Sequence, residues 1–451
     1  MHTTKLLPLA LLLAAFTSTL CAQSYPGLNV DNYAGVHGIH LNPANLGSIR
    51  TKTEINLASA AVSFSNDYAT ISGGDLRQAL REDDLESAIT ARSPGNNRMY
   101  VNADVIGPSL LLRLGKRTGL ALLTRARTVY SAEGVNGYLL EGIYNNFDRL
   151  PDFTADQNGY HSTLHSWGEA ALALGTTVVH HPNHRVKVGL TLKYLQGFGA
   201  VYTSGSTLSA EYRRQQERLL VGGDITFGRT DDYYFGELDP ANRSGGFGYD
   251  AGLVYEWHPG SAQDEYRDRY RVKVAVSLVD LGNIAYTATA ADYQLSGSLP
   301  ADEIEGGDLE YLLSDYYDGT ERSEEVTVGL PSALHALVDL RLTGSLYLSG
   351  LFTTSARDAE TPRSNTVPSS LTIAPRIERR GFGLYLPYTM RADADNHLGA
   401  GLRLGILTFG SGSILSHLLG DGNTTVDAFV GLKFPFHRKP AKAKGGVAGA
   451  E

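Results

Sequence analysis

The run Val272-Lys273-Val274-Ala275-Val276-Ser277-Leu278 shows the pattern that decides the fold of this chain. Apolar side chains occupy every second position, and lysine, alanine and serine lie between them. Because side chains alternate between the two faces of a strand, one face of such a strand is apolar and the other is polar. Runs of this kind recur more than a dozen times after residue 50, for example over residues 186–194.

An exported chain built from such strands is typical of a transmembrane β-barrel, whose greasy faces meet lipid while its polar faces line a lumen. Beyond residue 22 no run of eighteen apolar residues occurs, so we expect strands rather than helices to cross the membrane. The 50 glycines and 25 tyrosines suit turns, crowded walls and lipid interfaces. We predict an all-β antiparallel barrel of about 14 strands over residues 51–436.

The two ends of the chain differ from the barrel in composition. Residues 1–22 have Lys5 before an apolar stretch and end in Ala22, which predicts a secretory signal peptide. Its cleavage would remove the only cysteine, so we expect neither disulfides nor a thiol nucleophile. Residues 23–50 lack strand alternation, and the basic tail 437–451 is of low complexity, which predicts disorder there. The net charge of −9 disfavours nucleic-acid binding.

Fifteen segments alternate as strands do. A barrel with both termini in the periplasm needs an even number, so we settle on fourteen, the weakest candidate being the charged segment Leu208–Phe227. The candidates are Glu54–Ser65, Tyr100–Leu114, Leu120–Tyr130, Glu169–Val179, Arg185–Tyr202, Leu208–Phe227, Gly246–Trp257, Arg271–Val279, Ile284–Leu295, Glu325–Leu342, Ser345–Thr354, Ser369–Glu378, Gly383–Arg391, Leu398–Leu407 and Val426–Phe436.

Short and long connections alternate between these strands. The short ones predict periplasmic turns, and they cover residues 115–119, 181–184, 343–344 and 380–382. The long segments 131–164 and 298–325 predict external loops. Within residues 74–91, apolar side chains recur at near-helical spacing, which predicts a short amphipathic helix.

The alternation also predicts which polar side chains point into the lumen. These are Lys187, Lys193, Lys273, Asp339, Arg341, Asp427 and Lys433. Such mixed charges either pair with one another and with a plug, or line a path for a charged substrate, and the sequence leaves both readings open. The last strand ends in Phe434 and Phe436, an aromatic ending that predicts an assembly signal for the barrel-assembly machinery.

The residues that could catalyse a reaction or bind a metal do not form a recognisable site. The histidine pairs His161/His165 and His180/His181 lie at opposite ends of one predicted strand, too far apart to share a metal ion. The loop Ala301–Glu325 holds ten acidic residues, which predicts a solvated external loop or a site for divalent cations. No nucleophile elbow, zinc-protease motif or phosphate loop occurs, so we predict no catalysis, no metal and no cofactor.

Several segments together carry a resemblance to a known family. They are Tyr25–Val36, the motif Asn42-Pro43-Ala44, Ser277–Ile284, Gly329-Leu330-Pro331-Ser332, Gly401–Gly405 and Gly431–Pro435. In order and spacing they resemble an uncharacterised outer-membrane β-barrel family common in Bacteroidota. That family is similar to the long-chain fatty-acid transporter superfamily and to barrels of type IX secretion and gliding complexes. The resemblance implies a fourteen-stranded barrel with residues 23–50 folded into the lumen as a hatch that contains Asn42, Pro43 and Ala44.

Two functions follow from this reading. The first is a passive channel for small hydrophobic molecules, which the resemblance implies. The second is a structural or interaction barrel of an envelope or secretion complex, which long, charged and tyrosine-bearing loops favour. The partners we expect are outer-membrane lipid, the barrel-assembly machinery and, in the second case, envelope or secretion-complex proteins.

Overall fold

The computed structural model describes residues 25–72, 89–91, 95–145, 147, 150–157, 159–233, 244–259, 270–301, 304, 309–358, 361, 363–391, 394–420 and 422–437. The predicted signal peptide, the tail beyond residue 437 and most of the helix predicted over residues 74–91 lie outside this part of the chain. Residues 89–91 form strand β3 (Ile89–Ala91), which pairs with β2 (Ala69–Ile71). The prediction of a helix is therefore wrong at its C-terminal end.

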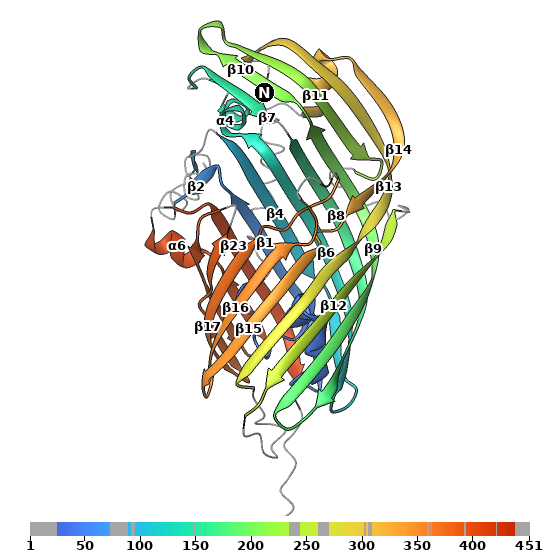
Figure 1. Cartoon of the computed structure of the whole chain (residues 1–451), viewed down its shortest axis with the longest axis vertical. Coiled ribbons are helices and arrows are strands. Elements are labelled where there is room, and N and C mark those ends of the chain that lie inside the picture. Colours follow the sequence, from blue (N-terminus) through green and yellow to red (C-terminus); the bar gives the residue numbers. More distant parts are fainter. Residues whose placement is uncertain are drawn as a thin grey trace, which may run out of the picture.

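The chain forms a closed antiparallel barrel, because the first wall strand pairs with the last. Some wall strands are interrupted, and their two parts, such as β4 and β5, are counted here as one strand of the wall. Counted in this way the wall has 14 strands, as predicted (Figure 1). In order these are β1 (Thr53–Asn66), β4 and β5 (Asn96–Ile106, Ser109–Arg113), β6 (Thr118–Asn136), β8 (Tyr160–His180), β9 (His184–Gly205), β11 and β12 (Arg218–Thr230, Gly245–Trp257), β13 (Val272–Pro300), β14 and β15 (Gly319–Gly329, Ala333–Thr343), β16 (Leu346–Ser355), β17 (Ser370–Arg379), β18 and β19 (Phe382–Tyr385, Tyr388–Arg391), β20 and β21 (His397–Leu398, Ala400–Leu404), β22 (Leu407–Ser411) and β23 (Thr425–Phe436).

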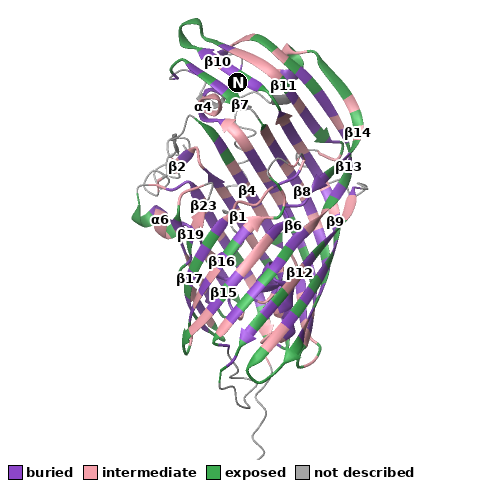
Figure 2. Cartoon of the chain, viewed as in Figure 1, coloured by how far each residue is buried: buried purple, intermediate pink, exposed green. Residues whose placement is uncertain are grey.

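Alternate burial along the strands follows the sequence pattern, as the striped ribbons of Figure 2 show. On β13, Val274 and Val276 are 39% and 44% exposed on the outer face. Lys273, which directly precedes Val274, is 5% exposed and faces the lumen. Within the described part of the chain the outer apolar band has no protein partner, and it is suited to lipid. None of the described helices is long and apolar enough to cross a membrane.

The wall is much taller on one side than on the other. Strands β6, β8, β9, β11, β13 and β14 rise well beyond the short strands β15–β23 (Figure 1). The tall side carries two short strands that pair with each other, β7 (Phe153–Gln157) and β10 (Leu208–Arg213). It also carries the 3-10 turn η4 (Arg214–Gln216) and the helices α4 (Gly137–Asn145) and α5 (Leu309–Tyr316). The segments predicted as external loops, 131–164 and 298–325, lie on this tall side, but their described residues are mostly strand ends and the helices α4 and α5 instead of irregular loop.

Three predicted strand boundaries are also wrong. The candidates Arg271–Val279 and Ile284–Leu295 form one strand, β13, which continues through a register shift opposite Tyr249 and Ala251. The candidate Glu325–Leu342 is instead divided into β14 and β15, since the intervening segment contains Pro331, which has no N–H for a ladder bond. The candidate Leu208–Phe227 forms β10 and β11, which are joined by η4.

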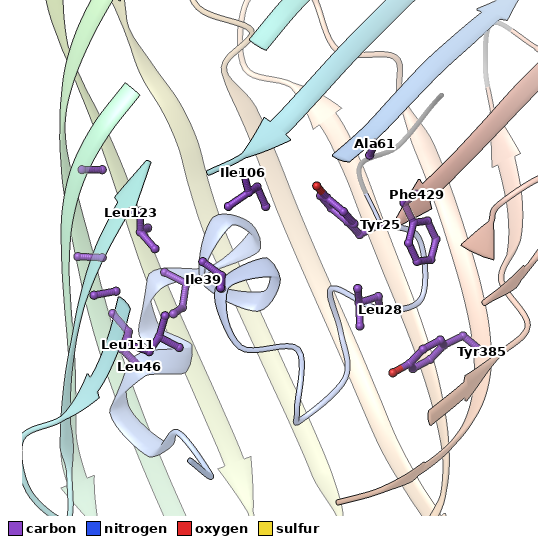
Figure 3. Packing of buried hydrophobic residues seen from close by; sticks show 14 residues of the cluster. Tyr25, Leu28, Ile39, Leu46, Ala61, Ile106, Leu111, Leu123, Tyr385 and Phe429 are labelled. Carbon is purple, nitrogen blue, oxygen red and sulfur yellow. The ribbon is translucent and has the colours of Figure 1, made fainter. Parts of the chain in front are cut away.

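The short turns, the start of β1 and the end of β23 all lie at one end of the barrel, which in this fold is the periplasmic end. Inside this end lies the N-terminal segment, with helix α2 (Val36–Leu41) and the 3-10 helix η2 (Pro43–Ser48). Figure 3 shows Leu28, Ile39 and Leu46 of this segment packed against wall side chains such as Ile106, Leu111 and Phe429. We refer to residues 25–50 as the hatch. The short helix α6 (Ile414–Leu419) lies outside the wall at the other end of β22 and β23.

Candidate functional site

The predicted motif Asn42-Pro43-Ala44 joins the two hatch helices and fixes them to the wall. The Oδ1 atom of Asn42 accepts a bond from the Ala44 backbone N–H at 2.9 Å, and Pro43 occupies the first position of η2. The Nδ2 group of Asn42 donates to the Val276 carbonyl at 3.0 Å and to the Leu253 carbonyl at 3.3 Å. One buried amide therefore caps η2 and binds carbonyls of β12 and β13.

A row of glycines in the wall makes room for this turn. Gly119, Gly175, Gly189 and Gly252 are register partners across β6, β8, β9 and β12. A Cβ atom at Gly189 would lie 2.3 Å from the Ala44 nitrogen, and one at Gly252 would lie 2.1 Å from Oδ1 of Asn42. The same holds for the other two, at 2.5 Å and 2.6 Å from hatch carbonyl oxygens. Only residues without a side chain let the hatch backbone approach this closely.

Buried charges bind the remainder of the hatch. Asp31 accepts from Tyr385 and, at 2.9 Å, from Arg403, and its pKa lies below the ordinary value, because these donors outweigh the cost of burial. Asn32 donates to Glu378 and, at 2.9 Å, to Tyr270. Both hatch residues therefore bind the luminal face of β17, β18, β21 and the start of β13.

The predicted lumen-facing residues fall into two groups. Lys187 contacts Ser48 and Glu256, and Lys433 donates to the Ala34 carbonyl at 2.7 Å, so both hold the hatch. Lys193, Lys273, Asp339 and Asp427 are buried among other luminal side chains: Lys193 pairs with Asp250 at 2.8 Å, Lys273 lies over the Tyr270 ring, Asp339 pairs with Arg376 at 2.6 Å, and Asp427 accepts from Ser411 at 2.9 Å. Arg341 lies half-buried at the periplasmic end, and the aromatic rings of Phe434 and Phe436 are exposed on the outer face.

Asp280 is the centre of the buried charge network above the hatch. It adopts a left-handed conformation with φ 56°, which non-glycine residues rarely adopt, and Val279 and Asp280 both face inward. Its carboxylate pairs with Lys193 of β9 and, at 2.7 Å, with Arg127 of β6. Lys193 also lies near Glu169 of β8, at 3.7 Å. The strain at Asp280 thus places one carboxylate between cations from two other strands.

The family-like motifs of β13 and of the β14–β15 break meet at this point. Ser332 donates its hydroxyl to the Asp280 carbonyl at 2.7 Å, and the Leu330 N–H donates to the Gly282 carbonyl at 3.1 Å. Arg357 donates to the carbonyls of Gly282 and Leu330, at 2.8 Å and 3.0 Å. Two motifs that are fifty residues apart in the sequence therefore form one structural unit with the start of a third segment.

That third segment lies between β16 and β17, and its described residues, 356–358, 361 and 363–369, fold into the lumen. Asn365 donates to the Thr163 carbonyl at 2.7 Å and to the Ser131 hydroxyl at 3.1 Å, so it reaches β8 and β6. Arg363 pairs with Glu324 at 3.0 Å and lies over the Tyr202 ring. We refer to this segment as the inward loop. The sequence analysis missed it, because a polar, proline-containing connection looks like any external loop.

Between the hatch and the inward loop lies a cavity of about 120 Å³. Tyr25, His37 and His40 line it from the hatch, and Val367 and Pro368 from the inward loop; the wall contributes charged groups such as Arg125 and Asp104, which form an ion pair at 2.8 Å. Tyr25 Oη and the Nε2 atoms of both histidines have no hydrogen-bond partner among the described residues. Burial lowers the pKa of His37 to about 3, so its imidazole is neutral.

Farther from the hatch the luminal face carries more apolar side chains, with the buried His165 among them, its Nε2 atom 2.9 Å from the Tyr286 hydroxyl. Inward-facing side chains of β4, β6, β8, β9, β13 and β14 form one buried cluster beside the inward loop. Its members are Tyr100, Val129, Trp167, Leu195, Ala200, Tyr202, Ile284, Tyr286, Ala288, Ala290, Val326, Val328 and Leu330. We refer to this cluster as the apolar wall. A water-filled pore would be polar here.

Two groups of site residues were absent from the sequence predictions. Arg376 and Arg403 are fully buried in the lumen, and the alternation on β17 and β21 that exposes Ile377 and Leu404 would have found them. The second group is His37 and His40 of α2, which lie outside the strands, so alternation could not have found them. Among the described residues, no group of three or more His, Cys, Asp or Glu side chains could hold a metal ion. In the acidic loop 301–325 of the cation hypothesis, residues 302, 303 and 305–308 lie outside the described part, whereas residues 309–316 form α5 and residues 319–325 begin β14.

A closed barrel with an apolar outer band and a plugged polar lumen defines a β-barrel of the outer-membrane type. The chain belongs to a family of unknown function (DUF5723), whose model matches residues 43–412, and this match confirms the resemblance seen in the sequence. No curated protein matches the sequence.

Solved structures with a similar fold include transporters from three bacteria. The toluene transporter TbuX of Ralstonia pickettii has a TM-score of 0.42 at 11% identity, over 90% of this chain and 95% of that chain. The toluene transporter TodX of Pseudomonas putida has a TM-score of 0.45 at 9% identity, over 93% and 100%. A FadL homologue of Pseudomonas aeruginosa has a TM-score of 0.43 at 11% identity, also over 93% and 100%.

Proposed function

We propose that this outer-membrane barrel is a passive channel for small hydrophobic molecules, closed here by the hatch and the inward loop. The observation that carries the proposal is the apolar wall, a buried cluster of mainly apolar side chains on the inner face of the barrel, above the charged layer at the hatch. Apolar side chains lining a concave site are the usual means of binding such molecules. On this proposal the protein catalyses no reaction and needs no cofactor.

Passage of a molecule through the barrel would require both the hatch and the inward loop to move out of the lumen. Each plug is held by hydrogen bonds and ion pairs, as at Asn365 and Asp31, and these can be exchanged for water. The cavity between them has polar atoms without protein partners at Tyr25 and His37, so a molecule that has passed the inward loop would enter a hydrated space.

The test is the entry of a hydrophobic dye into cells that express the protein. N-Phenyl-1-naphthylamine becomes fluorescent in membranes, and its rate of uptake should exceed that of cells with an empty vector. Ala288→Asp places a charge in the apolar wall and should slow uptake. Thr287→Asp, the exposed neighbour of Ala288 on the outer face of β13, is the matched control and should not. Uptake at the empty-vector rate, or equal rates for both variants, would contradict the proposal.

The tall side of the wall favours a second candidate, an interaction barrel of an envelope or secretion complex. Its outer surface is polar, with exposed Asp292 and Arg322 in contact, and its top is stabilised by an aromatic cluster that includes Phe147, Phe153 and Tyr212. A surface built this way is suited to protein partners outside the membrane. Affinity purification of the protein from native outer membranes should then recover specific envelope proteins, and replacing 206–217 with a short turn should lose them.

A further inference from the structure

Basic side chains surround the periplasmic end of the barrel. They come from the chain next to β1, from four hairpin ends and from the start of β13, and we refer to them as the basic rim. Six are exposed and three are half-buried: Lys52, Lys116, Arg117, Arg271, Arg379 and Arg380 in the first group, and Arg113, Arg185 and Arg341 in the second. This is a local excess in a protein whose net charge is −9.

No acidic residue that the structure describes at this end is exposed. Glu54, Glu256, Asp339 and Glu378 all point into the lumen, where each is at most 5% exposed. The opposite end of the barrel has charges of both signs, including exposed Glu211 beside Arg213 and Asp292 beside Arg322. Among the described residues, the positive excess is therefore a property of the periplasmic end.

The basic rim lies directly beside the lipid-facing band. Leu114 precedes the turn with Lys116 and Arg117, and it is 59% exposed. Trp257 is also exposed, and its carbonyl accepts a bond from the Arg271 N–H at 2.7 Å. Exposed apolar side chains next to exposed cations mark the depth at which hydrocarbon gives way to phospholipid headgroups.

We propose that the basic rim binds the phosphate groups of anionic phospholipids in the periplasmic leaflet. Seven of its nine members are arginines, whose planar guanidinium groups form paired hydrogen bonds to phosphate. Their spread over several turns suits a shell of small ligands, whereas one protein partner would contact a single sector. Bilayer surfaces with anionic lipids attract such residues strongly enough to change local lipid composition.

The two tryptophans of the chain make this binding measurable. Trp257 lies within the basic rim, in register with His184 and flanked by Arg185 and Arg271, whereas Trp167 is fully buried in the lumen. The variant Trp167→Phe leaves Trp257 as the reporter. We would reconstitute it in vesicles of phosphatidylcholine and phosphatidylglycerol, with bromine on the acyl chains of one lipid or the other. Brominated lipid quenches tryptophan only at close contact.

Quenching of Trp257 by brominated phosphatidylglycerol should exceed quenching by brominated phosphatidylcholine, with a several-fold preference that high salt reduces. Adding Arg271→Gln and Arg341→Gln should remove most of this preference. The matched pair Arg379→Gln and Arg380→Gln, at a different turn, should leave it unchanged at Trp257. Equal quenching by the two lipids would overturn the proposal, as would a preference that is unaffected by Arg271→Gln and Arg341→Gln. Neither result would bear on dye uptake.

Discussion

At the scale of single residues, the position of the hatch depends on wall glycines, which have no side chain, as well as on hydrogen bonds. Asn42 and Pro43 predict a bend from the sequence alone, and the structure has a bend there. The glycine row of Gly119, Gly175, Gly189 and Gly252 could not be predicted, because its members align only once the strand register is known. Pairing register depends on the whole barrel and not on local sequence.

The glycine row gives a direct test of hatch docking. Gly189→Val should destabilise the docked hatch by about 1–3 kcal/mol, since its side chain would overlap the backbone of Pro43 and Ala44. The barrel should then convert to its unfolded form on SDS gels at a lower temperature. Gly350→Val is the control, because a Cβ atom there meets nothing within 4 Å. Equal shifts for both variants would show that the hatch is not seated on this row.

His37 should make docking of the hatch sensitive to pH. Burial, and then the positive charge of Lys433, lower its pKa to about 3, against about 6.5 in an unfolded chain. Between these values the unfolded chain binds a proton that the docked hatch excludes, so stability should fall as pH falls below about 6.5. Asp104 and Arg125 also face this imidazole, with opposing effects.

The expected loss from pH 7.5 to pH 5 is about 2 kcal/mol for this one group. Heat conversion on SDS gels after incubation at each pH measures it. The variant His37→Gln should show a smaller fall, and the remainder would come from His40, whose pKa burial also lowers. A fall of the same size in His37→Gln would contradict this assignment.

At the scale of elements, β13 shows both the strength and the limit of sequence reading. Alternation placed Val274 outside and Lys273 inside. It also divided the strand into two, because the left-handed residue Asp280 shifts the phase of alternation without ending the strand. A change of phase looks like a turn in the sequence. The number of wall strands was therefore predicted, while several of their boundaries, and β22 as a separate strand, were not.

The same strand locates the edge of the membrane. Val274→Arg should cost roughly 2–4 kcal/mol, because it places a charge in the lipid-facing band. Gln294→Arg, also on an exposed outer position of β13 but on the tall side of the wall, should cost close to nothing. Urea unfolding of the two variants in lipid vesicles measures the difference. Equal costs would mean that the apolar band extends to residue 294.

At the scale of the whole molecule, the lumen is closed twice by segments from opposite ends of the barrel. The resemblance seen in the sequence implied the hatch as the plug. The structure adds the inward loop, which Arg357, Arg363 and Asn365 hold to β13, β14 and β8, respectively. Two closures in series mean that the conductance depends on the tighter one.

Deletions can separate these two closures. Deleting residues 25–41 should leave single-channel conductance in planar bilayers nearly unchanged, because the inward loop still crosses the lumen. Replacing residues 356–369 with a short turn should likewise have little effect while the hatch remains. The double deletion should open a pore with conductance several-fold above that of either single variant, with heat-modifiable barrels in all cases. A large conductance in the first variant alone would show that the inward loop leaves the lumen readily, and that the hatch, with its buried ion pairs, is the only effective barrier.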